Sequence, residues 1–280
     1  MRTQSRDTSP EVERVLIELI RKAPVSKRFG LVRSMTATLT KMSVRTYREQ
    51  HPQATWPEIV QIMRPHPHQL NLQLLEACLQ NKSSNAPFEP DILRALISIT
   101  AIFEKLNIST YIGGSVASAA YGMQQLAQDI DLVIELLPTQ IPQLIALLQP
   151  GYYVDEQEVY TAIQEHKNFT IIDLDTLLAI DVFVPSLSLF EKQIKTRVKR
   201  QVLDEMAHPL LLSSAEDIIL IKLFLHRKNK IFPDDQWNDV LGVLKVQESV
   251  LDLTYLERWA AHLNITNLLE QAYIDSGIKE

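Results

Sequence analysis

Hydrophobic residues recur at helical spacing through most of the first eighty positions. Between residues 11 and 22 they follow the three- and four-residue steps of one helix face, at Val12, Val15, Leu16, Leu19 and Ile20. Thr55 and Glu58 have the spacing of a capping box, which predicts a helix start at residue 56. The predicted helices of this segment are 11–22, 43–50, 56–63 and 69–79.

The pattern changes after a polar linker at residues 81–87, which ends in proline. Beyond it, helical stretches alternate with short runs of period two, which are typical of strands. The predicted helices are 90–106, 115–120, 141–148 and 156–166; the predicted strands are 110–112, 129–135, 152–154, 169–174 and 178–184, the last two forming a hairpin.

The chain becomes helical again from residue 215, with predicted helices at 215–227, 236–244, 253–262 and 265–273. We therefore expect an α+β fold, in which a small mixed sheet has flanking helices. The expected domains are an N-terminal helical region (1–82), an α/β core (88–205) and a C-terminal helical region (206–280).

Composition narrows the class of protein. Of the 280 residues, 46% are hydrophobic and 22% charged, as in ordinary soluble proteins. The longest apolar runs, such as 218–225, are far shorter than a membrane span of about 20 residues. The first residues lack the apolar core of a secretory signal, and the single Cys78 excludes an internal disulfide. These features favour a cytoplasmic protein without membrane contact.

Basic residues gather in three places. Residues 1–65 hold 12 Lys and Arg against 6 Asp and Glu, and shorter basic runs occupy 192–200 and 226–230. Such runs can follow a nucleic-acid backbone, but they are more often solvated faces. His66 and His68 lack a neighbouring acid or cysteine, so a metal site there is not favoured.

Gly113, Gly114 and Ser115 stand between a predicted strand and a predicted helix, in a chain with only seven glycines. Adjacent glycines allow a sharp turn and close approach of the backbone to a ligand, and we expect Ser115 to cap the helix. The N-terminus of a helix suits phosphate oxygens. The same turn is also a common connector without a ligand.

Asp129 and Asp131 lie two residues apart in a predicted strand, so both carboxylates point to the same face, about 6.6 Å apart along the strand. Two carboxylates that close repel unless a cation lies between them, and carboxylate oxygens suit Mg²⁺. The alternative is an exposed strand end with solvated acids. The apolar residues between and after the two acids favour a buried strand.

Asp181 is an isolated acid within the apolar run 178–184, where a charge needs a partner or a metal. Placed beside the first two acids, it would complete a three-carboxylate site, able to hold metals for phosphoryl displacement. Asp173 and Asp175 are weaker candidates, because they precede the run and fit the turn of the hairpin.

The order of these features resembles the DNA polymerase β-like nucleotidyltransferase superfamily: strand, Gly-Gly-Ser turn, helix, Asp-x-Asp strand and a third Asp on a later strand. Within it, the chain looks like the AbiEii-like abortive-infection toxin type. Residues 216–223 and 236–241 are similar to the helical region of that group, and the resemblance covers about 90–273. One departure is residues 123–128, which lack the arginine and threonine that relatives often have there.

The resemblance implies roles for these residues. Gly113, Gly114 and Ser115 would hold nucleotide phosphates, and Lys222 would meet the triphosphate. Asp239 would support the site. Asp129, Asp131 and Asp181 would bind Mg²⁺, and Asp181 would also help to deprotonate the attacking hydroxyl. Catalysis of this kind consists mainly of positioning and charge neutralisation.

The implied activity is transfer of a nucleoside monophosphate from a nucleoside triphosphate to a hydroxyl of RNA, protein or a small molecule. A second reading is a non-catalytic module that binds nucleotide or a partner protein. A third is a toxin–antitoxin component that an antitoxin partner restrains.

Overall fold

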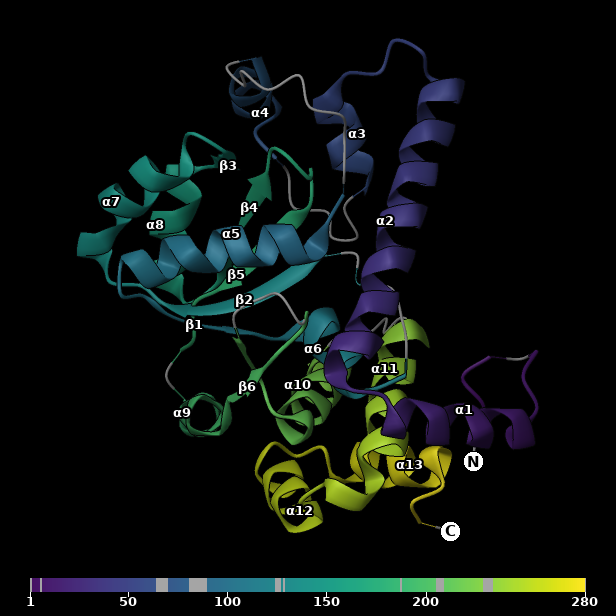
Figure 1. The fold of residues 1–280 in the computed structure, drawn as a ribbon. Coiled ribbons are helices and arrows are strands. Elements are labelled where there is room, and N and C mark those ends of the chain that lie inside the picture. The colour runs from purple at the N-terminus through teal and green to yellow at the C-terminus, as the bar shows by residue number, and fades with distance from the viewer. Residues whose placement is uncertain are drawn as a thin grey trace. The chain divides into compact units, whose positions relative to one another are not determined.

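The structure of the chain is a computed structural model that describes residues 2–5, 7–63, 70–80, 90–123, 127, 129–186, 188–204, 209–228 and 234–279. Helices and a mixed sheet make an α+β fold, as the sequence predicts (Figure 1). Its contacts divide it into two interleaved units. The helical unit comprises Met1–Val32, Gly113–Gln125 and Leu187–Glu280, and the sheet unit comprises Arg33–Ile112 and Leu126–Ser186.

The sheet unit is built on five strands in the order β3-β4-β5-β2-β1. Strand β2 pairs with β5 in parallel, and the other neighbours are antiparallel. The predicted hairpin of β4 and β5 is confirmed. The bounds are β1 (Ser109–Ile112), β2 (Ile130–Glu135), β3 (Tyr152–Val154), β4 (Asn168–Asp173) and β5 (Ala179–Phe183).

One face of the sheet carries the core of this unit. Along β2, Ile130, Leu132 and Ile134 are buried, while the residues between them are half-buried. Helix α5 runs along the sheet and contacts β1, α7 contacts β3, and α8 contacts β4 (Figure 1). Their bounds are α5 (Ile92–Lys105), α7 (Ile141–Leu148, after the 3₁₀ turn η1 at Pro138–Gln140) and α8 (Glu156–Glu165).

Two short helices, α3 (Trp56–Met63) and α4 (Leu72–Gln80), pack on the β3 end of the sheet unit. Val60 and Leu75 join Tyr153 in one buried cluster. The hydroxyl of Tyr153 accepts a hydrogen bond from the backbone N–H of Asn71 at 3.0 Å. The part of the N-terminal region that the structure describes here therefore shares a core with the sheet, although the sequence pattern separates the two.

The helical unit contains α6 (Gly114–Tyr121), which packs on α10 and α11. Lys245 on α11 forms an ion pair with Glu13 on α1 at 2.6 Å, and both side chains are 1% exposed. The remaining elements are α1 (Pro10–Lys22), the start of α2 (Val25–Gln50), α9 (Leu189–Arg197), β6 (Lys199–Gln201), β7 (Leu210–Leu212), α10 (Ala215–Lys228), α11 (Asp234–Gln247), η2 (Glu248–Val250), α12 (Leu253–His262) and α13 (Thr266–Ser276).

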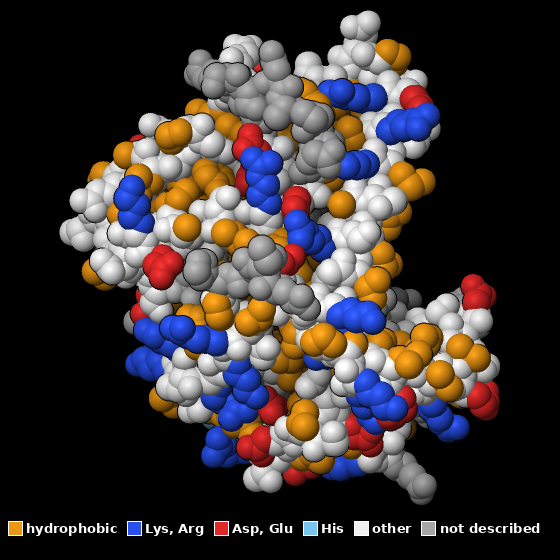
Figure 2. Space-filling model, in the orientation of Figure 1, with side chains coloured by type: hydrophobic (Ala, Val, Ile, Leu, Met, Phe, Trp, Pro, Cys, Tyr) orange, Lys and Arg blue, Asp and Glu red, His pale blue; other side chains and the backbone are white. Residues whose placement is uncertain are grey.

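Helix α1 turns most of its predicted apolar stripe outward. Ile17 and Glu13 are buried against α11, whereas Val12, Val15 and Leu19 are 54 to 61% exposed. Figure 2 shows hydrophobic side chains gathered at the surface beside α1. The face of α1 that packs on α11 therefore carries Glu13 and Ile17, and most of the predicted apolar stripe lies outside it.

Most predicted elements agree with the structure, two predicted helices differ in their bounds, and three elements have no counterpart in the prediction. The predicted helix 43–50 is only the last part of α2, which begins at Val25 and runs through Gly30 and a series of serines and threonines. The prediction has no element at α9, β6 or β7: charge dominates the pattern of α9 and β6, and β7 is only three leucines long. The predicted helix 69–79 begins at Leu72.

Several sequence features lie outside the described residues: His66 and His68, the linker 81–87, and parts of the stretches 123–128 and 226–230. The three domains 1–82, 88–205 and 206–280 stay predictions. None of the described helices is long and apolar enough to span a membrane.

Candidate functional site

The three predicted acids come together in the sheet unit. Asp129 directly precedes β2, Asp131 is the second residue of β2, and Asp181 is the third residue of β5. Strands β2 and β5 pair in parallel, with Asp131 directly opposite Asp181. Oxygen atoms of all three carboxylates lie within 4.8 Å of one another. The alternation of the strands and their register therefore produce a compact cluster of three acids.

Burial makes this cluster costly without a counter-charge. Asp181 is 3% exposed and Asp129 is 9% exposed, while Asp131 is half-buried. At this separation two unit charges repel by about 3–4 kcal/mol at an effective dielectric constant of about 20. A divalent cation would replace that repulsion with attraction. Three carboxylates that converge on one point suit Mg²⁺, which prefers oxygen ligands, so the donor set fits this metal.

Thr170 is a neighbour of the site that the sequence analysis missed. It lies on β4 directly opposite Asp181. Its buried hydroxyl donates a hydrogen bond to Oδ1 of Asp181 at 2.8 Å. This bond fixes the orientation of the carboxylate. Only the register of the hairpin reveals the pair, since eleven positions separate the two residues in the sequence.

The weaker candidates, Asp173 and Asp175, belong to the turn of the hairpin. The carboxylate of Asp173 accepts hydrogen bonds from the backbone N–H groups of Asp175 and Thr176, at 2.8 and 3.0 Å. Burial raises the pKa of Asp173, although these bonds oppose the shift. Asp175 forms an ion pair with Arg94 at 2.9 Å. Both acids therefore have structural partners in the turn region.

The glycine turn belongs to the helical unit. Gly113 is the N-cap of α6, and Gly114 begins the helix with φ of 50°, a left-handed conformation that favours glycine. The expectation that Ser115 caps the helix is wrong, because Ser115 lies inside the first turn. The N-cap Gly113 makes no side-chain hydrogen bond to this end of α6.

Lys222 and Asp239 form an ion pair on neighbouring helices of the helical unit. Nζ of Lys222 lies 2.8 Å from Oδ2 of Asp239 and donates to Oε1 of Gln236 at 2.5 Å. Both members of the pair are buried. Asp239 therefore holds the Lys222 ammonium group in place. A role of Lys222 toward a triphosphate stays a prediction.

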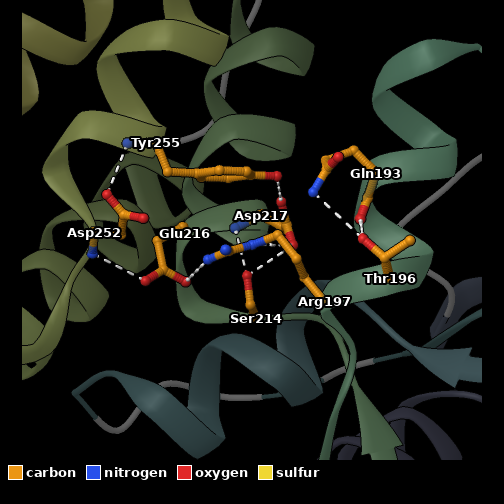
Figure 3. A network of polar contacts seen from close by, with 8 residues as sticks. All are labelled: Gln193, Thr196, Arg197, Ser214, Glu216, Asp217, Asp252 and Tyr255. Carbon is orange, nitrogen blue, oxygen red and sulfur yellow. Dashed lines mark hydrogen bonds and ion pairs between the residues drawn. The ribbon is translucent and has the colours of Figure 1, made fainter.

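A buried network at the start of α10 was not predicted (Figure 3). The carboxylate of Asp217 accepts hydrogen bonds from the hydroxyls of Tyr255 and Ser214, at 2.6 and 2.7 Å. Arg197 on α9 lies 3.0 Å from Oε2 of Glu216, and its guanidinium carbon is 3.8 Å from the centre of the Tyr255 ring. The basic run 192–200 thus supplies an internal cation as well as surface charge.

The chain is distantly similar to several solved structures. No protein-family model matches the chain, and no curated protein matches it. A crystal structure of ANT(2″)-Ia in complex with adenylyl-2″-tobramycin is 15% identical, with a TM-score of 0.43, over 61% of this chain and 96% of that one.

Two further solved structures give similar figures. An antigenic nucleotidyltransferase-like protein from Paracoccidioides brasiliensis is 15% identical, with a TM-score of 0.39, over 64% of this chain and 95% of that one. The solution structure of the antibiotic-resistance factor ANT(2″)-Ia is 19% identical, with a TM-score of 0.39, over 61% of this chain and 94% of that one. The function of this chain is therefore inferred from its own side chains.

Proposed function

We propose that this chain is an Mg²⁺-dependent nucleotidyltransferase. The observation that supports this most directly is the cluster of three carboxylates within 4.8 Å on paired strands. Asp129, Asp131 and Asp181 would hold the metal. When bound, Mg²⁺ supplies positive charge that neutralises phosphate oxygens as the transferred group moves.

The reaction joins a hydroxyl oxygen of the acceptor to the α-phosphorus of a nucleoside triphosphate. The bond from that phosphorus to the bridging oxygen of the β-phosphate breaks, and pyrophosphate leaves with the bond electrons. Asp181 is the proposed acceptor of the hydroxyl proton. Thr170 holds the Asp181 carboxylate through Oδ1 and so orients it for this role.

The other proposed roles concern the nucleotide. Backbone N–H groups of Gly114 and Ser115, at the uncapped start of α6, would bind phosphate oxygens. Lys222 would add positive charge toward the triphosphate, in the orientation that Asp239 gives it. RNA, a protein side chain or a small molecule would be the acceptor.

Labelling of an acceptor tests this activity. The protein is incubated with labelled nucleoside triphosphates, Mg²⁺ and either total RNA or protein, and the Asp129→Ala/Asp131→Ala double variant is the comparison. We expect labelling by the wild type that falls at least a hundredfold in the double variant. Equal labelling by the two proteins would contradict the proposed site.

A second candidate function is binding of nucleotide or a partner protein without catalysis, and the AbiEii-like alternative is a toxin–antitoxin component whose activity a partner restrains. The exposed apolar stripe of α1 favours a partner. Expression of the chain in a bacterial host separates the readings. Toxicity that the double Asp variant abolishes supports a catalytic toxin, whereas toxicity that persists in the variant supports a binding role.

A further inference from the structure

Ser213 is a buried serine whose hydroxyl has no hydrogen-bond partner within the described part of the chain. It joins β7 to α10 and is 0% exposed. Leaving a buried hydroxyl unsatisfied costs free energy, so buried polar atoms almost always have partners. The next residue shows the contrast, because Ser214 is equally buried and its hydroxyl bonds to Asp217. The Ser213 hydroxyl thus adds no hydrogen bond to the fold of the described residues.

The hydroxyl of Ser213 lies beside the glycine turn of the same unit. A β-carbon placed on Gly113 would be 4.0 Å from Oγ of Ser213. Gly113 is the N-cap of α6, an eight-residue helix (Gly114–Tyr121); the N-cap makes no side-chain hydrogen bond and the first turn has no acidic residue. The N–H groups of such a turn carry a partial positive charge that attracts anions. The unpartnered hydroxyl therefore lies next to a helix end suited to an anion.

The residue that follows Ser213 is anchored by hydrogen bonds at the start of α10. Ser214 caps α10, because its Oγ accepts the backbone N–H of Asp217 at 3.2 Å. Asp217 is fixed in turn by Tyr255, and Arg197 packs over the Tyr255 ring (Figure 3). A hydroxyl on such a support can meet a ligand without losing further conformational freedom.

We propose that Ser213 binds phosphate. Its hydroxyl donates a hydrogen bond to an oxygen of the triphosphate that the N-terminus of α6 holds. A β-carbon on Gly113 would meet Oγ of Ser213 at 4.0 Å, an ordinary contact distance, so the hydroxyl is the nearest side-chain group to the start of α6 at this position. This assignment rests on the proposed nucleotide site at α6 and adds a side-chain donor from a second element.

Binding of ATP and of inorganic triphosphate, measured by calorimetry in the presence of a chelator, tests the assignment. We expect Ser213→Ala to weaken both ligands about tenfold, as loss of one hydrogen bond to a charged group does. The thermal midpoint of the ligand-free variant should equal or exceed that of the wild type, because an unsatisfied hydroxyl has been removed.

Ser276→Ala is the matched control. Ser276 is also buried, but its hydroxyl donates to the backbone carbonyl of Tyr273 at 3.0 Å. This variant should lose thermal stability and bind ATP as tightly as the wild type. Weaker ligand binding without a loss of thermal stability identifies a ligand-binding hydroxyl, and a loss of thermal stability without weaker binding identifies a structural one.

Several results would overturn the proposal. One is that Ser213→Ala binds both ligands as tightly as the wild type, or binds only ATP more weakly and inorganic triphosphate normally. Another is that its thermal midpoint falls as that of Ser276→Ala does. The third is that the wild type binds neither ligand. If labelling fails but the Ser213 effect is present, the proposed transfer activity falls and the phosphate contact stands.

Discussion

Thr170 and Asp181 face each other across β4 and β5, and a buried hydrogen bond of 2.8 Å joins the hydroxyl of one to the carboxylate of the other. The bond ties the third acid of the cluster to the centre of the sheet. It leaves the acid with one oxygen that Thr170 does not bind. The geometry of the cluster therefore depends on a residue that carries no charge.

Thr170→Val keeps the branched side chain and removes this bond. We expect the affinity for Mn²⁺ or Mg²⁺, measured by calorimetry, to fall several-fold, since partners of metal ligands commonly affect affinity by about 10-fold or more. Thr161→Val is the control, because the exposed hydroxyl of Thr161 bonds only to the backbone of its own helix. Equal affinities in the two variants would remove Thr170 from the site.

Metal binding should appear as a change in thermal stability. Mg²⁺ at a hundred times its dissociation constant would stabilise the wild type by about 2.7 kcal/mol, or roughly 5–10 °C at this chain length. Asp129→Asn/Asp131→Asn should show no such gain. Its metal-free midpoint should be higher than that of the wild type, because two repelling charges are gone. Glu104→Gln, on the exposed surface of α5, is the control.

Loss of the Tyr255 hydroxyl should destabilise the helical unit. In Tyr255→Phe the buried Asp217 carboxylate loses a donor at 2.6 Å, which costs about 1–3 kcal/mol. Urea denaturation measures the loss, with Tyr160→Phe on α8 as the comparison for removing a tyrosine hydroxyl. A stability equal to that of the wild type would mean that the Asp217 carboxylate needs no donor from α12.

Asp217 should give the protein a stability that falls as pH rises. Burial raises the pKa of Asp217 from 3.8, even though Tyr255, Ser214 and Arg197 oppose the shift. At pH values between the pKa of Asp217 in the unfolded chain and its higher pKa in the folded chain, the folded state binds more protons than the unfolded state. The stability of the wild type relative to Asp217→Asn should therefore decrease as pH rises from about 4. Urea denaturation at several pH values measures this difference.

Glu216 should give the protein a stability that increases as pH rises, the opposite of the dependence expected for Asp217. Burial alone would raise its pKa, but the backbone N–H of Asp252, its other hydrogen bonds and Arg197 outweigh burial and lower it. The stability of the wild type relative to Glu216→Gln should therefore increase as pH rises to the ordinary glutamate pKa. The same slope for both variants would contradict the two assignments.

The buried pair of Lys245 and Glu13 should be essential for docking α1. Glu13→Gln leaves a buried ammonium group without its counter-charge, and we expect a loss of about 3–5 kcal/mol in the free energy of unfolding. Arg45→Ala, which removes the exposed ion pair of Arg45 with Glu49, should lower the free energy of unfolding by less than about 1 kcal/mol. Limited proteolysis of residues 10–22 gives an independent measure of docking.

The acids of the site could be predicted because each belongs to a recognisable local sequence pattern. Asp129 and Asp131 stand two apart in an alternating strand, and Asp181 interrupts an apolar one. Their assembly needs only the parallel pairing of β2 with β5. Thr170 belongs to no such pattern, because a threonine is ordinary in a strand and its role comes from register alone.

The helical unit was harder to predict for the same reason. Arg197 belongs to a run of basic residues, and nothing in that run distinguishes the one that packs on Tyr255 and lies beside Glu216. The first part of α2 contains residues with weak helix preference, so the sequence pattern does not predict a helix there. Long-range contacts determine both, and local periodicity carries no information about them.

The interleaving of the two units has a consequence for synthesis on the ribosome. The chain passes between the units four times, after residues 32, 112, 125 and 186. The acid cluster can form once residue 186 has emerged, but α6 contacts α10 and α11, which are made about a hundred residues after it. A nascent chain therefore acquires its metal ligands well before its glycine turn is in place, and it must keep the apolar α6 from aggregating during that interval.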